Sequence, residues 1–377
     1  MKVGILTFHR ADNYGAVLQA CALVNTFRSY GMDCELIDYR CRAIEKVYEY
    51  QYLPPIRKNF IKWIIDFRRN IRTVPKKIEK KRKCMEFRNQ HLPMSKSVST
   101  VEDRKRIEKE YDLIVTGSDQ IWNQKLTGGV DEWYCFKKSE KQTSVVSYGA
   151  SIGDLNVYKD YFHQVDEILK EYAMISVREN TAKAFLENRL NIPVYRVLDP
   201  TLLVDSGCWK KLMKNETTST DSYIFYYDVE TNKVAKRIAI HLSQKENLKL
   251  IHFNPDMRNN SWWMYAEDAG PIEFLELIAN AKYIVTSSFH ATVFSILFEK
   301  QFVTIPHPET GSRVKDLLSE LDLKHHICVD LESWNENIVK EKQDYTEVFK
   351  KLEGLKKESF GFIENAITLA NRGIDSE

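Results

Sequence analysis

Hydroxyl side chains and a histidine gather where the apolar run Tyr283 to Thr286 gives way to a second apolar stretch. The run has the composition of a buried strand, and Ser287, Ser288 and His290 stand at the start of the helix expected after it. The first amides of a helix lack partners inside the helix and can hold an anion, and a histidine can donate a proton near neutral pH. The pattern therefore predicts an anion-binding catalytic centre. The alternative is that a serine caps the helix while His290 packs in the interior, and the residue types weigh the two equally.

Two arginines stand at similar positions and are candidates for holding the same anion. Arg178 ends the strand-like run Ala173 to Val177, and Arg313 follows a later strand. A hydrogen bond to a charged group contributes about 1.5–3 kcal/mol, which is enough to matter for a small anionic ligand. The alternatives are an ion pair of Arg178 with Glu179 or Asp199, and a solvated Arg313 at the start of a helix.

Polar residues also follow two strand-like runs in the first half of the chain. They are Asp12, Asn13, Tyr14 and Gly15 after the first run and Gly117, Ser118, Asp119 and Gln120 after the second. Gly15 lets a ligand approach the backbone, but its turn lacks the Gly-x-Gly-x-x-Gly spacing of dinucleotide sites. Asp119 can accept hydrogen bonds from hydroxyl groups or act as a base. For both Asn13 and Asp119, helix capping is the alternative.

Strand-like and helical patterns alternate along the chain, which is typical of α/β folds with parallel sheets. Lys2 to Phe8, Ala16 to Tyr30 and Asp33 to Tyr39 form a strand–helix–strand unit, and a second α/β set begins at Tyr223, after the polar stretch Asp205 to Asp221. We expect two Rossmann-like domains facing a cleft: an N-terminal domain at 1–205, a C-terminal domain at 206–344 and a helical tail at 345–377 packing back. Ligands of such sheets bind outside the carboxyl ends of the strands, where the candidate residues lie.

The composition argues against several classes of protein. The net charge is +2, so no whole-molecule field favours nucleic acid, and the seven scattered cysteines contain no Cys-x-x-Cys pair. A disulfide framework or a zinc site is therefore not expected. The sequence shows no uncharged apolar run of bilayer-spanning length and no signal-peptide pattern at its start. We expect a cytoplasmic protein.

A strongly basic insertion interrupts the α/β pattern at about residues 56–90. From Arg57 to Arg88 it holds 13 basic and 3 acidic residues, with aliphatic and aromatic residues interleaved near its start. A basic amphipathic helix with Trp and Phe can lie in the interface of an anionic membrane. The alternative, slightly favoured because solvated charge runs are common, is that the apolar residues pack on the domain while the lysines stay in water.

Six segments, taken together, resemble the polysaccharide pyruvyl transferase family. They are Asn13 to Ala20, Asp112 to Asn123, Tyr148 to Ser151, Ser176 to Glu179, Leu198 to Leu203 and Ile284 to Ile296, and they run in the family's order. The resemblance implies an architecture similar to the GT-B glycosyltransferases and transfer of a pyruvyl group from phosphoenolpyruvate to a glycan as a ketal. It implies neither a metal nor a cofactor, since phosphoenolpyruvate is the co-substrate. Where family members often carry an arginine two residues before the histidine, this chain has Ser288.

The resemblance and the residue types together give each candidate a role. His290 and Asp119 are expected to be catalytic, Arg178, Arg313, Ser287 and Ser288 to bind the donor, and Asp12, Asn13, Tyr14, Gly117 and Ser118 to bind the acceptor. The implied acceptor is a capsular or exopolysaccharide repeat unit or its polyprenyl-linked precursor, which would bring the protein to the inner face of the membrane.

Two other functions fit the same pattern. One is a nucleotide-sugar glycosyltransferase of the same architecture, which would release a nucleotide instead of phosphate. The other is a non-catalytic glycan-binding protein, because the arginine expected at position 288 is a serine. Fold-level similarity alone does not decide between these functions and the pyruvyl transferase.

Overall fold

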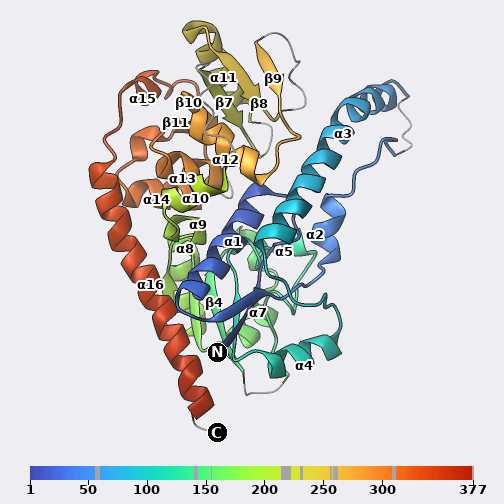
Figure 1. Cartoon of the computed structure of the whole chain (residues 1–377), viewed down its shortest axis with the longest axis vertical. Coiled ribbons are helices and arrows are strands. Elements are labelled where there is room, and N and C mark those ends of the chain that lie inside the picture. Colours follow the sequence, from blue (N-terminus) through green and yellow to red (C-terminus); the bar gives the residue numbers. More distant parts are fainter. Residues whose placement is uncertain are drawn as a thin grey trace. The chain divides into compact units, whose positions relative to one another are not determined.

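The computed structural model describes residues 1–55, 60–139, 143–153, 155–213, 222–229, 232–254, 257, 262–307 and 311–375 (Figure 1). Its contacts divide the chain into two compact units. The first unit comprises Met1–Val47, Arg88–Val204 and Phe349–Glu377, and the second comprises Tyr48–Phe87 and Asp205–Val348. Each unit contains one parallel sheet, so the fold is of the α/β class that the sequence predicts.

The sheet of the first unit has six parallel strands in the order β2-β1-β3-β4-β5-β6. The strands are β1 (Lys2–Leu6), β2 (Asp33–Leu36), β3 (Leu113–Thr116), β4 (Ser144–Ala150), β5 (Met174–Val177) and β6 (Val194–Arg196). The helices of this unit include α1 (Tyr14–Ser29), α2 (Arg42–Val47), α4 (Val101–Glu110), α5 (Gln124–Thr127), α6 (Leu155–Tyr158), α7 (Phe162–Leu169), α8 (Asn180–Leu190) and α9 (Pro200–Leu203). The strand order reverses between β1 and β3, and open α/β sheets bind ligands at such a switch point.

Helix α1 begins at the switch point of the first sheet. Apolar and small residues fill it almost throughout, so it is buried nearly all round instead of along one stripe. The side chain of Asn13 accepts hydrogen bonds from the amides of Gly15 and Ala16 at 3.0 and 3.4 Å. This cap fixes the start of the helix soon after β1. As a result, Asp12 and Asn13 lie at the carboxyl edge of the sheet.

The C-terminal helix α16 (Thr346–Asp375) packs on the first unit from Phe349 onward. The hydroxyl of Ser359 accepts a hydrogen bond from the amide of Leu198 at 2.9 Å. The ring of Phe362 lies 6.1 Å from that of Tyr148 in β4 and 5.4 Å from that of Tyr195 in β6. Helix α16 therefore packs against β4 and β6, in the half of the sheet that ends at β6.

The sheet of the second unit has five parallel strands in the order β11-β10-β7-β8-β9. The strands are β7 (Tyr223–Tyr227), β8 (Lys249–His252), β9 (Trp263–Tyr265), β10 (Tyr283–Thr286) and β11 (Gln301–Thr304). The helices include α10 (Ser206–Leu212), α11 (Lys233–Glu246), α12 (Pro271–Asn280), α13 (Phe289–Leu297), α14 (Ser312–Glu320), the short 3₁₀ helix η1 (Lys324–His326) and α15 (Asn337–Lys340). Here the order reverses between β7 and β10, which makes their carboxyl ends the second switch point.

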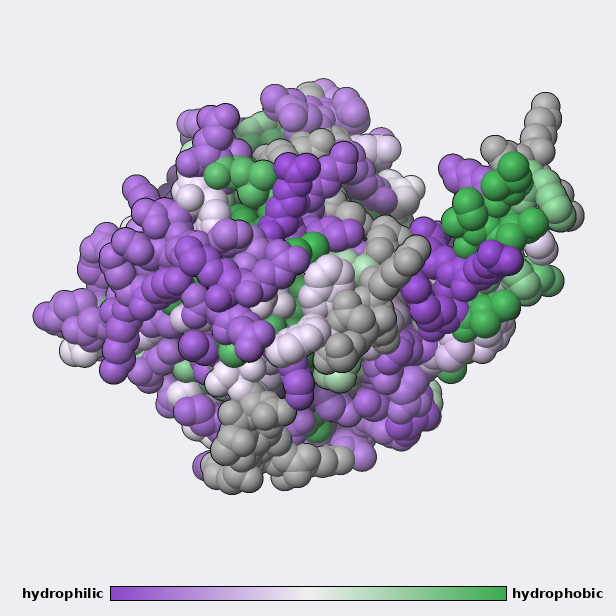
Figure 2. All heavy atoms as spheres, turned by 90° about the horizontal axis from the view of Figure 1, so that it is seen from above, coloured by the Kyte–Doolittle hydropathy of each residue, from purple (hydrophilic) through white to green (hydrophobic). Residues whose placement is uncertain are grey.

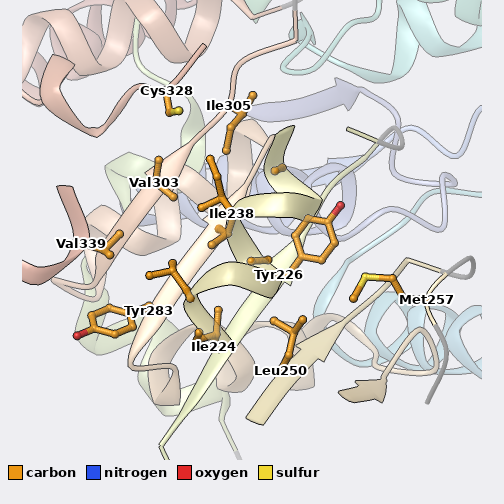
Figure 3. Packing of buried hydrophobic residues seen from close by; sticks show 14 residues of the cluster. Ile224, Tyr226, Ile238, Leu250, Met257, Tyr283, Val303, Ile305, Cys328 and Val339 are labelled. Atoms are coloured by element: carbon orange, nitrogen blue, oxygen red, sulfur yellow. The ribbon is translucent and has the colours of Figure 1, made fainter. Parts of the chain in front are cut away.

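A hydrophobic cluster holds the second sheet against its helices (Figure 3). Ile224 of β7, Leu250 of β8 and Val303 of β11 are fully buried, and Ile238 and Leu242 of α11 are almost equally inaccessible to water. Full burial of one such side chain contributes about 1.5–3 kcal/mol. The strands that precede the candidate residues of this unit are therefore held in place by a close-packed hydrophobic core.

Helix α3 (Phe60–His91) forms most of the basic insertion. Its Lys76 lies 2.7 Å from Asp268 and its Lys83 lies 2.8 Å from Glu273, and both ion pairs fall inside the second unit. The insertion up to residue 87 accordingly clusters with the second unit, whereas the sequence pattern assigned it to the N-terminal domain. The difference arises because its partners lie about 190 residues further along the chain. Arg57 and Lys58 at its start lie outside the described residues.

The polar stretch that separates the two α/β sets is partly helical. It contains α10, whose Trp209 is buried at 2% exposure and meets the ring of Phe294 edge to face at 5.2 Å. This aromatic pair ties the start of the second unit to α13, the helix that follows the Ser-Ser-Phe-His segment. Residues 214–221 of the stretch lie outside the described residues.

Candidate functional site

The end of β3 places Asp119 at the switch point of the first sheet. Gly117 has φ 121°, and a Cβ atom on it would overlap the carbonyl oxygen of Tyr148. The hydroxyl of Thr7 donates to the carbonyl oxygen of Ser118 at 2.7 Å, and the hydroxyl of Ser118 donates to the carbonyl oxygen of Gly149 at 3.3 Å. These bonds fix the turn, so Asp119 emerges from a rigid strand end.

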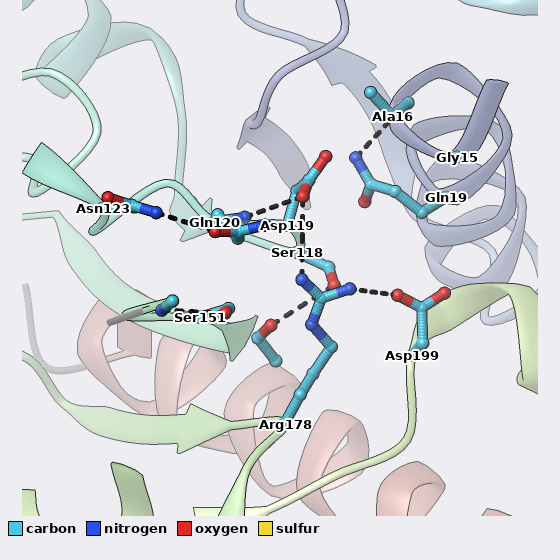
Figure 4. Close-up of polar contacts among 12 residues, drawn as sticks. Gly15, Ala16, Gln19, Ser118, Asp119, Gln120, Asn123, Ser151, Arg178 and Asp199 are labelled. Carbon is cyan, nitrogen blue, oxygen red and sulfur yellow. Dashed lines mark hydrogen bonds and ion pairs between the residues drawn. The ribbon is translucent and has the colours of Figure 1, made fainter. Parts of the chain in front are cut away.

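Arg178 lies between two carboxylates at this switch point (Figure 4). Its guanidinium donates to the buried Asp199, and its Nη2 lies 3.7 Å from Oδ1 of Asp119. Burial by itself would lower the pKa of Arg178, but the negative charges of Asp199, Asp119 and Glu179 outweigh it and raise that pKa. The guanidinium is therefore a permanent buried cation. Of the three residues in the two ion pairs, Asp119 is the most exposed, with 14% of its side chain accessible.

Two roles were considered for Arg178, an ion pair with a neighbouring carboxylate and binding of a donor anion. The ion pair with Asp199 is present, and Asp199 also accepts hydrogen bonds from the amide and hydroxyl of Thr201 at 3.0 and 2.6 Å. Binding of a donor anion by Arg178 stays a prediction. The arrangement places the Asp119 carboxylate next to a buried cation, and its oxygens can accept hydrogen bonds from hydroxyls.

Further polar groups lie near Asp119, and their pairing leaves no signal in the sequence. The Asp119 carboxylate accepts a hydrogen bond from the amide of Gln120 at 2.8 Å, and the side-chain amide of Asn123 donates to Oε1 of Gln120 at 2.7 Å (Figure 4). The hydroxyl of Ser151 donates to the carboxylate of Glu179. Such a mixture of amides, hydroxyls and carboxylates is what recognition of a polyhydroxylated ligand requires.

The first turn of the unit is held by an ion pair between distant residues. Arg88, at the end of α3, lies 2.9 Å from Asp12, and the two side chains are only 6% and 3% exposed. Asn13 is occupied in capping α1, as its alternative interpretation anticipates, and Tyr14 is 1% exposed. Ser118 is fully buried as well. In the described conformation, therefore, Tyr14 and Ser118 support the edge of the sheet from inside, and their contact with an acceptor stays a prediction.

Ser288 caps the helix that follows β10 in the second unit. Its hydroxyl accepts a hydrogen bond from the amide of Ala291 at 3.3 Å, and its own amide donates to the hydroxyl of Thr286 at 3.0 Å. The hydroxyl of Ser287 accepts from the amide of Val229 at 3.3 Å. The capping role weighed for these serines is thus present at Ser288.

His290 and Arg313 are brought to one aromatic ring. The ring of Phe289 meets that of His290 at 5.2 Å with an interplanar angle of 83°, and the guanidinium carbon of Arg313 lies 5.4 Å from its centre. His290 is 8% and Arg313 is 9% exposed, so both residues are almost wholly buried. Arg313 is therefore not a solvated helix-start residue; it is packed beside the first turn of α13. A buried guanidinium and an imidazole at a helix N-terminus can bind and protonate an anion.

The predicted site residues thus fall into two groups, one at each switch point. Asp12, Asn13, Asp119 and Arg178 lie in the first unit, and Ser287, Ser288, His290 and Arg313 lie in the second. Among the described residues, no cluster of three or more His, Cys, Asp or Glu side chains could hold a metal ion. The sequence does not indicate that Arg88 pairs with Asp12, because the two residues lie 76 positions apart and share no local pattern.

Two parallel α/β sheets, each with polar residues at its switch point, define a protein of GT-B fold. The structure is similar to a putative UDP-N-acetylglucosamine 2-epimerase from Listeria monocytogenes, with TM-score 0.54, 10% identity and coverage of 95% of this chain and 90% of that one. It is also similar to the UDP-GlcNAc 2-epimerase of Methanocaldococcus jannaschii, with TM-score 0.53 and 14% identity, and to that of Neisseria meningitidis, with TM-score 0.52 and 12% identity. Each of these two comparisons covers 98% of this chain and 100% of the other. At these identities the likeness concerns the fold alone.

The sequence is more specific than the fold. Residues 13–308 match the model of the family described as polysaccharide pyruvyl transferase, so the chain belongs to that family. The match includes the segments around Asn13, Asp119, Arg178 and His290 on which the resemblance was based. Comparison with curated proteins finds no match.

Proposed function

We propose that this protein transfers a pyruvyl group from phosphoenolpyruvate to a sugar of a cell-surface polysaccharide or of its lipid-linked precursor, forming a pyruvate ketal. The observation that carries the proposal is the meeting of His290 and Arg313 on the ring of Phe289, at the first turn of α13. We propose that this corner supplies both a cation and a proton donor for an anionic enol.

Donor binding is assigned mainly to the second unit. Phosphoenolpyruvate carries a carboxylate and a phosphate, and both prefer guanidinium groups and free amides at helix starts. Arg313 is the proposed principal cation, and we propose that Ser287 and Ser288, which follow β10, add hydroxyl donors. Ser288 can still donate its hydroxyl hydrogen while its oxygen caps α13. Arg178 is the second cation proposed for the donor.

The reaction requires one proton donor and one acceptor of hydroxyl protons. His290 gives a proton to the methylene carbon of the enol, and the positive charge that develops at the neighbouring carbon is attacked by one sugar hydroxyl, whose proton passes to Asp119. A second hydroxyl of the same sugar then forms the second C–O bond at that carbon. As this second bond forms, the C–O bond to phosphate breaks, and phosphate leaves with the electron pair and takes up the proton of the second hydroxyl. Asp119 releases the first proton to solvent, and solvent reprotonates His290. No electron is gained or lost overall.

Acceptor binding is assigned to the first switch point. Asp119 is the more accessible carboxylate of the Asp119–Arg178–Asp199 group, Gln120 follows it in the chain, and the side chain of Asn123 bonds that of Gln120. Hydroxyl pairs of a sugar match such a set of acceptors and donors. We propose that Asp12, Asn13 and Gly117 shape the same edge, because they set the positions of the turn after β1 and the turn after β3.

Release of inorganic phosphate from phosphoenolpyruvate in the presence of a glycan acceptor tests the proposal. We expect phosphate release that depends on the acceptor, and a loss of about 10²–10⁴-fold in kcat for Asp119→Asn, which removes a general base. Lys342→Gln, an exposed change outside both switch points, serves as the control and should keep full activity. Phosphate release that persists without any acceptor would contradict the transfer.

A nucleotide-sugar glycosyltransferase is the second candidate. It is favoured by the fold, because the Methanocaldococcus epimerase of similar structure is described in complex with UDP-GlcNAc and UDP. The same assay with sugar nucleotides separates the two, since this activity would release a nucleotide and no phosphate. If neither donor is consumed while glycan still binds, the non-catalytic alternative holds.

A further inference from the structure

The first half of α3 exposes a row of apolar side chains to water. Phe60, Ile61 and Ile65 are 69%, 72% and 60% exposed, and Ile71 is 51% exposed. Figure 2 shows hydrophobic surface in green beside strongly hydrophilic surface in purple on the molecule. Monomeric soluble proteins seldom leave several neighbouring large apolar residues in water unless the surface binds something.

Basic side chains alternate with these apolar ones. From Phe60 to Arg72, four basic residues stand against the single acid Asp66. The four are Lys62, Arg68, Arg69 and Arg72, and all are exposed. Ile61, Ile65, Arg68 and Arg72 follow the spacing i, i+4, i+7, i+11, so they share one face of the helix. The apolar residues are therefore surrounded by positive charge on their own face.

The opposite flank of this helix segment is already occupied. The ring of Trp63 stacks on Phe60 at 6.2 Å and on Phe67 at 5.4 Å, and its indole nitrogen donates to the carbonyl oxygen of Pro54 at 3.1 Å. The side chain of Asn70 donates to the carbonyl oxygens of Gln51 and Tyr52 at 3.2 Å. The residues before the helix thus hold one side of it rigid, and the face bearing Ile61 and Ile65 remains accessible.

We propose that this face of α3 binds the surface of an anionic membrane. Aliphatic side chains that enter the headgroup region while flanking arginines and lysines contact lipid phosphates are the arrangement of interfacial helices. Charge complementarity selects the partner: a second copy of the chain in a symmetric contact would bring these four cations opposite one another. In addition, no helix among the described residues is long and apolar enough to cross a bilayer, so contact through α3 is peripheral.

This inference does not rest on the proposed chemistry. Helix α3 would bind the membrane surface whether or not phosphoenolpyruvate is the donor. If the acceptor is lipid-linked, the same contact brings the protein to its substrate. Failure of vesicle binding would leave the phosphate-release test untouched, and failure of that test would leave vesicle binding untouched.

Vesicle flotation of the full chain tests the proposal, with vesicles of phosphatidylcholine alone and of equal parts phosphatidylcholine and phosphatidylglycerol. We expect flotation only with the anionic vesicles, and a loss of binding as salt is raised, because salt screens surface charge. Arg68→Gln combined with Arg72→Gln should weaken binding by about 25-fold, at about 5-fold per basic residue near the surface. Ile61→Gln combined with Ile65→Gln should weaken it on the order of tenfold or more.

A matched control replaces exposed apolar residues elsewhere in the same unit. Val329 and Leu331 are 61% and 40% exposed, and Val329→Gln combined with Leu331→Gln should float like the unmodified protein. All replaced side chains are exposed, so each variant should keep its thermal unfolding midpoint. No flotation at low salt, or equal flotation of all variants, would overturn the proposal. So would a concentration-dependent dimer in lipid-free solution that the Ile61 and Ile65 changes abolish, because a second copy would then cover the face.

Discussion

The guanidinium of Arg313 lies over the ring of Phe289, 5.4 Å from its centre, although 24 residues separate the two in the chain. The contact brings a cation to the first turn of α13, which Ser288 caps. It stands at the carboxyl end of β10, next to the β7–β10 switch point of the second sheet.

Replacing Arg313 tests whether it holds the donor. Arg313→Ala should raise the apparent KM for phosphoenolpyruvate about 10–100-fold, which corresponds to the loss of a charged hydrogen bond of about 1.5–3 kcal/mol. Arg313→Lys keeps the charge and should recover part of that loss. Initial rates of phosphate release across a donor titration give the result. An unchanged KM in Arg313→Ala would remove this residue from the donor site.

His290 should affect the chemical step more than binding. His290→Ala is expected to lower kcat by about 10²–10⁴-fold, because a positioned proton donor is lost. His290→Gln keeps a hydrogen-bond donor of similar size and should remain as slow, since glutamine does not transfer protons. Single-turnover measurements with saturating donor isolate the step. Equal rates for His290→Gln and the unmodified protein would show that this imidazole has no role in proton transfer.

Arg178 should be important for stability as well as for binding. Arg178→Met leaves Asp199 buried without its cation, and we expect a loss of about 3–5 kcal/mol in the free energy of unfolding. Adding Asp199→Asn removes the unpaired charge and keeps a cap for Thr201, so part of the stability should return. Urea unfolding of the two variants measures this difference.

Activity separates the two roles of Arg178. If Arg178 contacts the donor, the Arg178→Met, Asp199→Asn double variant remains inactive despite its recovered stability. If the double variant regains activity together with stability, Arg178 serves only to hold the fold of the first unit.

Asp38 should make the first unit sensitive to acid. Burial by itself would raise the pKa of Asp38, but hydrogen bonds from His9 and Arg10 outweigh it and lower that pKa. The Asp38 carboxylate accepts from Nε2 of His9 at 3.0 Å and from Nε of Arg10 at 2.6 Å. Its folded pKa lies below its unfolded value of about 3.9, so the unfolded state binds the proton more readily, and stability is lost as pH falls below about 4.

The control for this acid sensitivity is Asp38→Asn. The variant should be less stable at neutral pH, and its stability should fall less steeply between about pH 4 and pH 2. Thermal unfolding midpoints across that range give both slopes. Parallel curves for the two proteins would mean that Asp38 does not contribute to the pH dependence.

Gly117 should not tolerate a side chain. Its φ of 121° is unfavourable for other residues, and an added Cβ would overlap the carbonyl oxygen of Tyr148, so Gly117→Ala should cost at least about 1–3 kcal/mol. Gly207 in α10 is the matched control, because nothing lies within 4 Å of a Cβ built there. Gly207→Ala should raise stability by up to about 1 kcal/mol. Denaturant midpoints compare the two.

Strands with strong local signals were predictable from the sequence. The β-branched and aromatic runs at Tyr223 to Tyr227 and Tyr283 to Thr286 coincide with β7 and β10, because both lie in the middle of a parallel sheet and are apolar on both faces. The strand β9 was not predicted. It has only three residues, stands at the edge of its sheet and leaves Met264 51% exposed, so it carries no such run.

The sequence predicted which residues belong to the candidate site. It did not predict which of their side chains contact one another. The serines and His290 follow from the local pattern of a strand end before a helix, and their neighbourhood follows from the switch-point rule. By contrast, the contacts of Arg88 with Asp12 and of Arg313 with Phe289 join residues 76 and 24 positions apart. Periodicity describes one element at a time, so it cannot show which side chains from different elements meet.

The route of the chain between the two units has a practical consequence for dissecting the protein. The backbone passes from one unit to the other at four places, after residues 47, 87, 204 and 348. A cut after Val204 would separate the other parts of the first unit from α16, whose Ser359 and Phe362 contact Leu198 and Tyr148. Neither unit is therefore an uninterrupted stretch of sequence, and a chain cut after Val204 should give two fragments that remain associated until they are denatured.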